Sequence, residues 1–575
     1  MPGIPLDTLQ LEAPIGEGAW SKVWRAADPS TGRTLAVKIL TGRSLDDPLV
    51  GANFSAEVRA VAALDHPSIV RLHDFGEVPA ETAAASQGQL HAGWPYLVLD
   101  FAPGVPLYDV PGPLSYGVLR VILLELLDAL AHAHARGVVH RDLKPDNVLV
   151  DGTRCRLTDF GIARPTVGAS SNRFRMTRRT DPTMLGTPHF MAPEQIEGRW
   201  RDQGPWTDLY SLGCMAFELA CGRPPYDADT VMGTLLAHMS APIPVLEPVV
   251  AVPPGFGPWV ARLLAKGPGQ RFQHAADAAW DLLTLGQPDE GTAPVPTVVA
   301  ISFTSTFETF VAQRPASPTA LTEEMRSVGR PAPIYQGPPI PDDWRRDPPT
   351  PTIPPLRGGL HLFGLRPFPL IGREAQRDAL WTTLRAVHAT GLPRVVVLTG
   401  PSGCGKTRLV HWLAERAHEL GAATTLVATH EQGGTPQDGL GPMLVRHFAC
   451  EGLDAEQVAG RVDIVLPEAT DEERRALEAL LVRHAPDQAA ASVELARGGT
   501  VERPRLVRFA SSAERYVAIR RTLARLAARR PVLLVLDDVI HGADALNFAE
   551  AVLNAQSHDP LAALILVTAS DEAMG

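Results

Sequence analysis

Asp142, Asn147 and Asp159 are polar residues whose types and spacing suit phosphoryl transfer. They stand in the strings HRDLKPDN, at 140–147, and DFG, at 159–161. A carboxylate such as Asp142 can accept the hydrogen bond, and later the proton, of an attacking hydroxyl, while Asn147 and Asp159 can hold Mg²⁺ against phosphate groups. Charge builds up on phosphate oxygens in the transition state, so the chemistry needs mainly position and countercharge.

Both strings resemble those of the eukaryotic-like protein kinase family, and further segments extend the resemblance, in the family's order, over the first ~285 residues. It implies that Asp142 is the catalytic base and that Lys144 neutralises the moving phosphoryl group. Lys144, two residues after Asp142, resembles the Ser/Thr-specific form of this loop. The expected activity is therefore transfer of the γ-phosphate of ATP to Ser/Thr hydroxyls of protein substrates, with Mg²⁺.

A glycine-rich segment at 15–23 (IGEGAWSKV) is flanked by apolar positions and predicts two antiparallel strands. Glycines such as Gly16 and Gly18 let a backbone approach phosphates closely, because no Cβ intervenes. The third glycine of the family pattern is Ser21 here. Taken alone, the segment fits an ordinary hairpin equally well.

Lys38 interrupts an apolar run at 35–40. A half-buried strand rarely contains a lysine without a partner. The resemblance places this lysine on the α and β phosphates, paired with a helix glutamate, and Glu57 is the candidate. The alternative for Glu57 is a solvated helix face.

The resemblance also implies an adenine pocket between two lobes. Leu99 would guard its back, while Asp100, Phe101 and Ala102 would offer backbone groups to the adenine edge. Residues 76–93 are expected to form a solvent loop. The residues implied in ATP binding in this half are Ile15, Gly16, Gly18, Val23, Ala36, Lys38, Leu99, Asp100 and Ala102.

A helix is predicted over 114–136, where apolar residues recur at helical spacing. Residues 159–194 resemble an activation segment, in which Thr183, then Thr180, is the expected phosphorylation site, with Thr177 also a candidate. The family pairs the glutamate that ends this segment, here Glu194, with a late arginine, here Arg271. Asp208 matches the aspartate that anchors the backbone of the catalytic loop.

A second nucleotide site is predicted where an apolar run at 394–399 leads into GPSGCGKT, at 400–407, and then into a helical pattern at 408–418. This is GxxxxGK[ST] in its setting of strand, loop and helix. Backbone N–H groups of the loop and the helix N-terminus would cradle phosphates. The binding residues are Gly400, Gly403, Gly405, Lys406, which would reach the β and γ phosphates, and Thr407, which would bind Mg²⁺.

Another buried strand, at 531–538, ends in two carboxylates. Asp537 would hold Mg²⁺ through water, and Asp538 would polarise an attacking water. Together with GRE at 372–374, these features resemble the signalling ATPases of the AAA+/STAND class. Relatives often carry a nucleotide-sensing arginine where Ser570 stands, so sensing of the γ-phosphate is in question.

The expected fold is multidomain. An N-terminal tail (1–8) precedes an α+β two-lobed kinase fold (9–285), with a small lobe (9–102) and a large lobe (103–285). A Pro-rich linker (286–364), which favours extended chain, leads to an α/β P-loop NTPase domain (365–575), apparently incomplete at its C-terminus. A docking motif within the linker is the alternative to plain spacing.

Charge and cysteine content argue against some classes of binding partner and predict a cellular compartment. The net charge of −11 and a pI near 5.9 argue against a nucleic-acid binder or an anionic-membrane binder. Five cysteines without metal-ligand spacing, no signal-peptide pattern and no run of membrane-spanning length predict a cytoplasmic protein. The second domain is a candidate for self-association.

Two alternatives to a kinase carry different expectations. Pseudokinases usually lose the metal aspartate, the base or the strand lysine, whereas Lys38, Glu57, Asp142, Asn147 and Asp159 are all present. The other alternative is a nucleotide-switched signalling scaffold whose kinase half only binds ATP. Phosphate incorporation by wild type and Asp142→Asn separates these hypotheses.

Overall fold

The computed structural model describes residues 3–18, 21–41, 58–152, 154–160, 188–286, 335, 337–345, 370–430, 439–466, 468–482 and 509–570. The described chain divides into two compact units. Residues 3–286 belong to the first, and residues 335–344 and 370–570 to the second. Each unit is described by itself.

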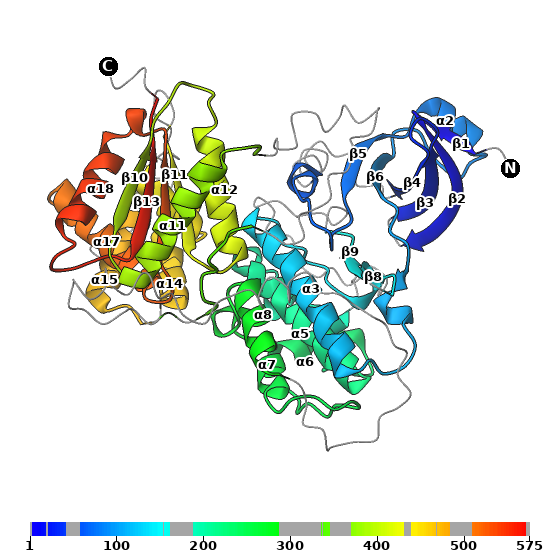
Figure 1. The fold of residues 1–575 in the computed structure, drawn as a ribbon. Helices are drawn as coiled ribbons and strands as arrows, with labels where there is room; N and C mark the ends of the chain where they lie inside the picture. The colour runs from blue at the N-terminus through cyan, green and yellow to red at the C-terminus, as the bar shows by residue number, and fades with distance from the viewer. Residues whose placement is uncertain are drawn as a thin grey trace, which may run out of the picture. The chain divides into compact units, whose positions relative to one another are not determined.

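The small lobe of the first unit is an antiparallel six-stranded sheet with the order β1-β2-β3-β4-β6-β5 (blue in Figure 1). Its core contains apolar side chains such as Leu35, Val37 and Ile39, none of which is exposed. The strands are β1 Ile4–Leu6, β2 Leu9–Gly18, β3 Ser21–Asp28, β4 Arg33–Leu40, β5 Leu72–Glu77 and β6 Pro95–Asp100.

Two segments of this lobe differ from the sequence-based expectation. The expected N-terminal tail contains β1, which pairs with β2 because Leu6 and Leu9 bury their side chains in the sheet core. The expected solvent loop at 76–93 contains the short helix α2 (Ala80–Ala85), where Thr82 donates a 2.7 Å hydrogen bond to the carbonyl of Pro5. Both differences arise from apolar or hydroxyl side chains that find partners distant in sequence.

The large lobe is mainly helical and is coloured cyan to green in Figure 1. Its α-helices are α3 Tyr116–Ala135, α4 Pro193–Ile196, α5 Pro205–Cys221, α6 Val231–Ser240, α7 Phe256–Leu263 and α8 Ala275–Thr284. A small sheet of β7 Val105–Pro106, β8 Val148–Val150 and β9 Cys155–Leu157 carries the catalytic strings. Short 3-10 turns lie at Leu107–Asp109, Pro145–Asn147, Pro188–Phe190, Trp200–Asp202 and Pro268–Gln270.

Helix α3 is the predicted helix of 114–136 and forms the centre of this lobe. Ser115 caps its N-terminus by accepting a hydrogen bond from the N–H of Val118. It is buried on nearly all sides, and its Glu125 accepts a 2.8 Å hydrogen bond from the N–H of Cys155 on β9. The helix thereby supports the sheet that presents the catalytic strings.

The second unit is a parallel sheet with the order β10-β13-β12-β11, flanked by helices. Figure 1 shows α11 and α12 on one side of the sheet and α17 and α18 on the other. The strands are β10 Arg394–Leu398, β11 Thr424–Thr429, β12 Val532–Asp537 and β13 Ala563–Thr568. The helices are α11 Glu374–Thr390, α12 Lys406–Glu419, α13 Leu440–His447, α14 Ala455–Val465, α15 Asp471–Val482, α17 Ser512–Ala527 and α18 Ala543–Asn554, with a 3-10 turn at Val539–His541.

Part of the segment expected to be a linker packs on this second unit. We call residues 335 and 337–344 the strap. The indole N–H of Trp381 on α11 donates a 3.0 Å hydrogen bond to the carbonyl of Pro341. Arg416 on α12 donates through Nε to the carbonyl of Trp344 at 2.7 Å. The strap therefore joins the two helices on one side of the sheet.

Candidate active sites

Asp142 lies in the loop between α3 and β8, beside two other polar residues of HRDLKPDN. The amide nitrogen of Asn147 donates to the carbonyl of Asp142 at 2.7 Å and lies 3.4 Å from its carboxylate. The Lys144 ammonium lies 3.8 Å from the same carboxylate. The side chains of Asp142 and Lys144 are each about one-fifth exposed, which leaves them accessible to a substrate.

The loop backbone is held by Asp208 at the beginning of α5, as predicted. Its buried carboxylate accepts 2.8 Å hydrogen bonds from the N–H groups of His140 and Arg141, and another from His134. Burial alone would raise the pKa of Asp208, but these hydrogen bonds and the nearby histidines lower it below its ordinary value. Arg141 has a φ of 63°, a conformation that a non-glycine residue needs external support to hold.

His140 connects this loop to the DFG string. Its Nδ1 accepts from the N–H of Asp142 at 3.3 Å, so Nε2 carries the proton that it donates to the carbonyl of Thr158 at 2.9 Å. Burial lowers the pKa of His140 more than the charge of Asp208 raises it, in agreement with a neutral ring. Its ring also contacts that of Phe160, with centroids 4.6 Å apart.

Lys38 and Asp159 form an ion pair that bridges the two lobes. Their Nζ and Oδ1 atoms are 2.6 Å apart, and Lys38 is almost completely buried on β4. Asp159, two residues after β9, has a φ of 61°, so its backbone is no longer in the extended conformation of a strand. Glu57, the expected partner of Lys38, lies outside the described residues, as does the expected activation segment from 161 to 187 with its threonines.

The residues implied in adenine binding lie on neighbouring strands. Ala36 on β4 pairs in register with Leu99 on β6, and Val23 on β3 pairs with Lys38. At the end of β6, Asp100 and Ala102 are half-buried; Gly16 and Gly18 end β2, where Ile15 is exposed. The structure therefore brings the implied set onto one sheet and its connection to the large lobe.

The donor set of this first site suits Mg²⁺. Asn147 and Asp159 present amide and carboxylate oxygens, the ligands that this ion prefers. The N–H of Thr158, the residue before Asp159, donates to the carbonyl of Asn147 at 3.0 Å. This bond holds together the two chain segments that bear the candidate ligands. Amide Nδ2 of Asn147 is engaged by Asp142, which leaves its Oδ1 for a cation.

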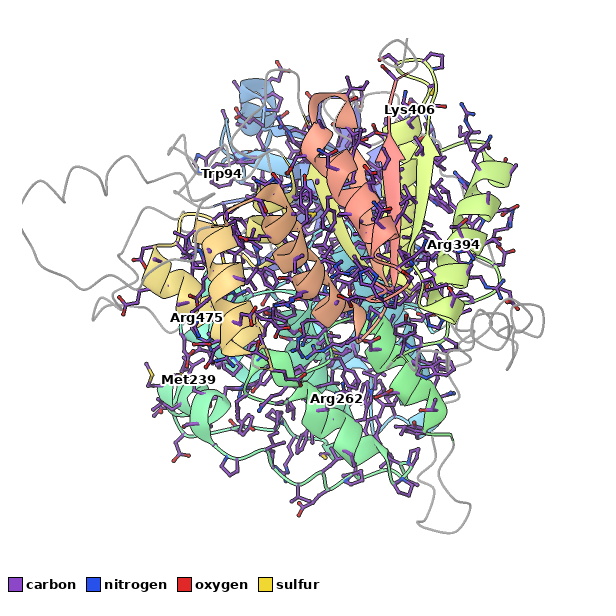
Figure 2. All side chains as sticks on the ribbon, turned by 90° about the vertical axis from the view of Figure 1, so that its left-hand side faces the viewer. Trp94, Met239, Arg262, Arg394, Lys406 and Arg475 are labelled. Atoms are coloured by element: carbon purple, nitrogen blue, oxygen red, sulfur yellow. The ribbon has the colours of Figure 1, made fainter. Side chains whose placement is uncertain are left out.

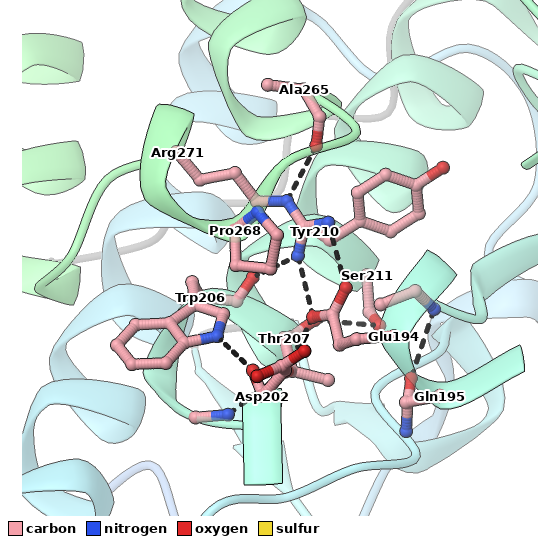
Figure 3. A network of polar contacts seen from close by, with 12 residues as sticks. Glu194, Gln195, Asp202, Trp206, Thr207, Tyr210, Ser211, Ala265, Pro268 and Arg271 are labelled. Atoms are coloured by element: carbon pink, nitrogen blue, oxygen red, sulfur yellow. Dashed lines mark hydrogen bonds and ion pairs between the residues drawn. The ribbon is translucent and has the colours of Figure 1, made fainter. Parts of the chain in front are cut away.

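A buried ion pair lies within a polar network of the large lobe (Figure 3). Arg271 and Glu194 are both completely buried and form a bidentate pair with distances of 2.8 and 3.0 Å. Thr207 also donates to Glu194 at 2.8 Å, and the guanidinium lies over the ring of Tyr210. The predicted pairing of Glu194 with Arg271 is confirmed.

Gln195, the residue after Glu194, binds the backbone of the catalytic loop. Its side-chain amide donates to the carbonyl of Arg141 at 2.9 Å and accepts from the N–H of Ala192 at 3.0 Å. The sequence analysis missed Gln195; its position directly after Glu194 was the available signal. Asp142 is thus positioned by α5 through Asp208 and by the start of α4 through Gln195.

The predicted phosphate loop lies between β10 and α12, at the carboxyl end of the parallel sheet. Gly403 and Gly405 have φ values of 76° and 93°, and no atom lies within 4 Å of a Cβ built on either. Their backbone is open to a ligand in a conformation that favours glycine. Figure 2 shows Lys406 near this end of the sheet and Arg394 nearer the start of β10. The Lys406 ammonium donates to the carbonyls of Gly400 and Pro401 at 2.8 and 2.9 Å.

Thr407 and Asp537 meet at this end of the sheet, as their predicted roles require. The Thr407 hydroxyl donates to the Asp537 carboxylate at 3.0 Å, so a hydroxyl and a carboxylate oxygen stand together and suit Mg²⁺. Thr568, at the end of β13, donates to the same oxygen at 2.6 Å and accepts from the N–H of Asp538 at 2.8 Å. Sequence reasoning missed Thr568, because it concentrated on Ser570 two residues later.

Three further groups shape this second site. Asp538 is exposed and has a φ of 54°, while His430 at the end of β11 shares a 2.9 Å hydrogen bond with the carbonyl of Asp537. Arg373, of the predicted GRE string, donates to the carbonyl of Cys404 at 3.1 Å. The string therefore contacts the phosphate loop directly, which spacing alone did not indicate.

None of the helices in the described residues is both long and apolar enough to cross a membrane. The five cysteines Cys155, Cys214, Cys221, Cys404 and Cys450 are free thiols.

Comparison with known proteins supports the same division. Residues 9–264 match the family model of the protein kinase domain, and residues 369–567 match that of the AAA ATPase domain. Both classes of domain bind ATP, typically with Mg²⁺.

Similar curated proteins are bacterial. The chain is 35% identical over 268 residues to the serine/threonine-protein kinase PknA of Mycobacterium tuberculosis, covering 46% of this chain and 58% of PknA. It is 34% identical over 291 residues to PknB of Mycobacterium leprae, covering 49% of this chain and 44% of PknB. The chain thus spans about half the length of these relatives.

Among solved structures, the kinase domain of Mycobacterium tuberculosis PknI is similar, with 23% identity and a TM-score of 0.36, covering 50% of this chain and 99% of that one. The catalytic strings, the confirmed Glu194–Arg271 pair and the phosphate loop agree with the two family matches. The chain therefore contains a region similar to protein kinase domains, at residues 9–264, and a region similar to AAA ATPase domains, at residues 369–567.

Proposed function

We propose that the first domain is a Ser/Thr protein kinase that transfers the γ-phosphoryl group of ATP to hydroxyls of protein substrates. The observation that carries this proposal is the Lys38–Asp159 ion pair, which joins the nucleotide-binding sheet to the loop bearing Asp142 and Asn147. PknA and PknB are named as serine/threonine-protein kinases, which supports the same specificity.

In this proposal the substrate hydroxyl donates a hydrogen bond to the Asp142 carboxylate. The hydroxyl oxygen bonds to the γ-phosphorus, the bond to the β–γ bridging oxygen breaks, ADP leaves, and the proton passes to Asp142. Lys144 balances the charge of the moving phosphoryl group, and Lys38 orients the phosphates. Asn147 and Asp159 would hold Mg²⁺ in the first site, Thr407 and Asp537 would hold it in the second, and the ion would supply positive charge next to phosphate oxygens.

We propose that the second domain is a nucleotide-dependent regulatory module. A phosphate cradle is provided by Gly403, Gly405, Lys406 and Thr407. The hydroxyl of Thr568, at the end of β13, contacts the Asp537 carboxylate, so a threonine and not an arginine provides the polar group at this position. Self-association through this domain is its proposed mode of action. The five free thiols favour a reducing compartment, and we place the protein in the cytoplasm.

The test compares phosphate incorporation from labelled ATP by purified wild type, Asp142→Asn and Lys144→Met. We expect Asp142→Asn to lose activity by several orders of magnitude, because the hydroxyl loses both its orientation and its proton acceptor. ATP binding by Asp142→Asn should persist. Substantial autophosphorylation by Asp142→Asn would refute the kinase assignment and favour the scaffold alternative.

The activation segment provides a second test. Phosphorylation of Thr183, or next of Thr180, is proposed because several arginines stand near them in the sequence and Arg141 precedes the base. Mass spectrometry of active enzyme should find phosphate between residues 159 and 194. Active enzyme without any phosphate in that range would contradict this regulation.

A further inference from the structure

A cavity of about 300 Å³ lies in the first unit, away from the catalytic loop. It is bordered by the start of β4, the end of β6, the loop before β5 and the start of β9, so both lobes contribute to it. Its volume is at the lower end of the range for small-ligand sites. The charged side chains that line it are Arg33, Arg71, Arg154, Arg156, Asp65 and Asp100.

The lining is cationic. Four guanidinium groups face two carboxylates, which leaves two positive charges in excess. Asp100 is paired with Arg33 at 3.3 Å, and Asp65 with Arg71 at 3.6 Å. Within the described parts of the chain, Arg156 forms no direct ion pair, although its charge acts on Asp100 and that of Arg154 acts on Glu125.

Asp100 is already fully engaged by protein groups. Besides Arg33, it is 2.6 Å from Nε2 of His73. Burial raises the pKa of Asp100. The His73 hydrogen bond and the charges of His73, Arg33 and Arg156 together lower it by more, so the pKa lies below its ordinary value. The carboxylate therefore stays ionised and faces the positive charges of Arg33 and Arg156.

Two of the arginines that line the cavity have a buried Nε donor without a partner. The Nε atoms of Arg71 and Arg156 are buried and have no hydrogen-bond partner among the described residues. A buried donor without a partner lowers stability, and an anion that accepts from it would remove that cost. Each guanidinium group can bind phosphate oxygens with two parallel hydrogen bonds.

We propose that this cavity binds a phosphate monoester. Such a group carries a charge of about −1.5 to −2 at pH 7, which matches the excess of two positive charges better than a single carboxylate does. Because the lining comes from both lobes and from Asp100 at their connection, the bound anion would also tie the lobes together beside the segment implied in adenine binding. The phosphate could be free in solution or carried by a protein side chain.

The experiment is isothermal titration calorimetry on the full-length chain in a Lys406→Ala background, which removes phosphate binding at the second domain. The probes are N-acetyl-phosphothreonine amide, inorganic phosphate and, as a control, N-acetyl-threonine amide. We expect saturable binding of the phosphorylated probes and none of the threonine amide. Tighter binding of phosphothreonine amide assigns the site to a protein-borne phosphate; equal or tighter binding of inorganic phosphate assigns it to a free anion.

Arg156→Gln should weaken binding about tenfold or more, because one charge-assisted hydrogen-bond donor is lost. Arg154→Gln is the second variant, in case Arg156→Gln does not fold. The matched control is Arg223→Gln, which removes a half-exposed arginine that pairs with Glu247 outside the cavity. Absence of saturable binding by both phosphorylated probes, or equal affinity of Arg156→Gln and wild type, would overturn the proposal.

Discussion

The lysines of the two nucleotide sites are held by partners at very different distances along the chain. In the first domain, Lys38 meets Asp159 across the lobes, and the supporting Glu194–Arg271 pair joins residues 77 positions apart. In the second, Lys406 bonds to carbonyls five and six residues away in its own loop. The lysine of the first site therefore depends on tertiary packing, whereas the lysine of the second is held by its own loop. The second site also needs tertiary packing, because Thr407 and Asp537 are 130 positions apart.

The sharpest test of this contrast replaces each of the two lysines in turn. Lys38→Met should lower phosphoryl transfer about 10³-fold or more, because phosphate orientation and countercharge are lost together. Lys406→Ala should abolish nucleotide binding at the second site and leave the rate of the first domain nearly unchanged. Labelled-phosphate assays and nucleotide titrations on both full-length variants measure these effects. A large fall in kinase rate for Lys406→Ala would show that the second domain gates the first directly.

Arg271→Met tests the dependence on packing. Removing one partner leaves Glu194 charged and buried, which costs about 3–5 kcal/mol of unfolding free energy. Denaturant unfolding, followed by a probe in the first domain, measures the loss.

The control is Arg262→Gln, whose half-exposed pair with Asp281 should contribute about 1 kcal/mol at most. The double variant Glu194→Gln/Arg271→Met should recover part of the stability, because no unpaired charge remains. Equal stability of Arg271→Met and wild type would mean that the buried pair is dispensable for the fold.

Gly403→Ala tests the dependence on backbone conformation. The φ of 76° is strained for alanine, and since no atom lies within 4 Å of the added Cβ, strain is the expected cause of any effect. We expect nucleotide affinity at the second site to fall by roughly 1–2 kcal/mol. The matched control is Gly460→Ala in α14, where the added Cβ also meets no atom and helix propensity should raise stability by up to ~1 kcal/mol.

Trp344→Ala tests the strap and should have the smallest effect. The Trp344 ring packs edge-on against Trp412 at 4.8 Å, and its N–H donates to Asp378 at 2.7 Å. We expect a loss of about 1–2 kcal/mol in the unfolding transition of the second domain, with the first domain unchanged. Trp200→Ala, at a half-exposed position in the first domain, is the control. An unchanged second transition would mean that the strap does not stabilise that domain.

Motifs that are continuous in sequence allowed most of both sites to be predicted. HRDLKPDN fixes the spacing of Asp142 and Asn147. The strand-loop-helix pattern around Lys406 predicts an α/β P-loop fold. The Glu194–Arg271 pair was predictable only by family resemblance, because nothing local to Arg271 indicates a partner 77 residues away.

Contacts that depend on three-dimensional packing were not predictable. Thr568 contacts Asp537 because β12 and β13 are neighbours in the sheet, and a pattern of apolar residues does not specify strand order. The strap was expected to be part of a linker, since proline frequency indicates extended chain but not which surface it meets. Trp344, an aromatic residue among prolines, was the available signal.

Strand β10 lies at an edge of the sheet in the second unit. Within the described strands, β10 pairs only with β13, and Val397 on it is 54% exposed. Parallel strands are normally covered on both sides, and an open edge with apolar side chains offers unpaired N–H and C=O groups to another chain. A strand from a second molecule that docked there would lie directly beside the phosphate loop, so aggregation and nucleotide occupancy would compete for one edge of the sheet.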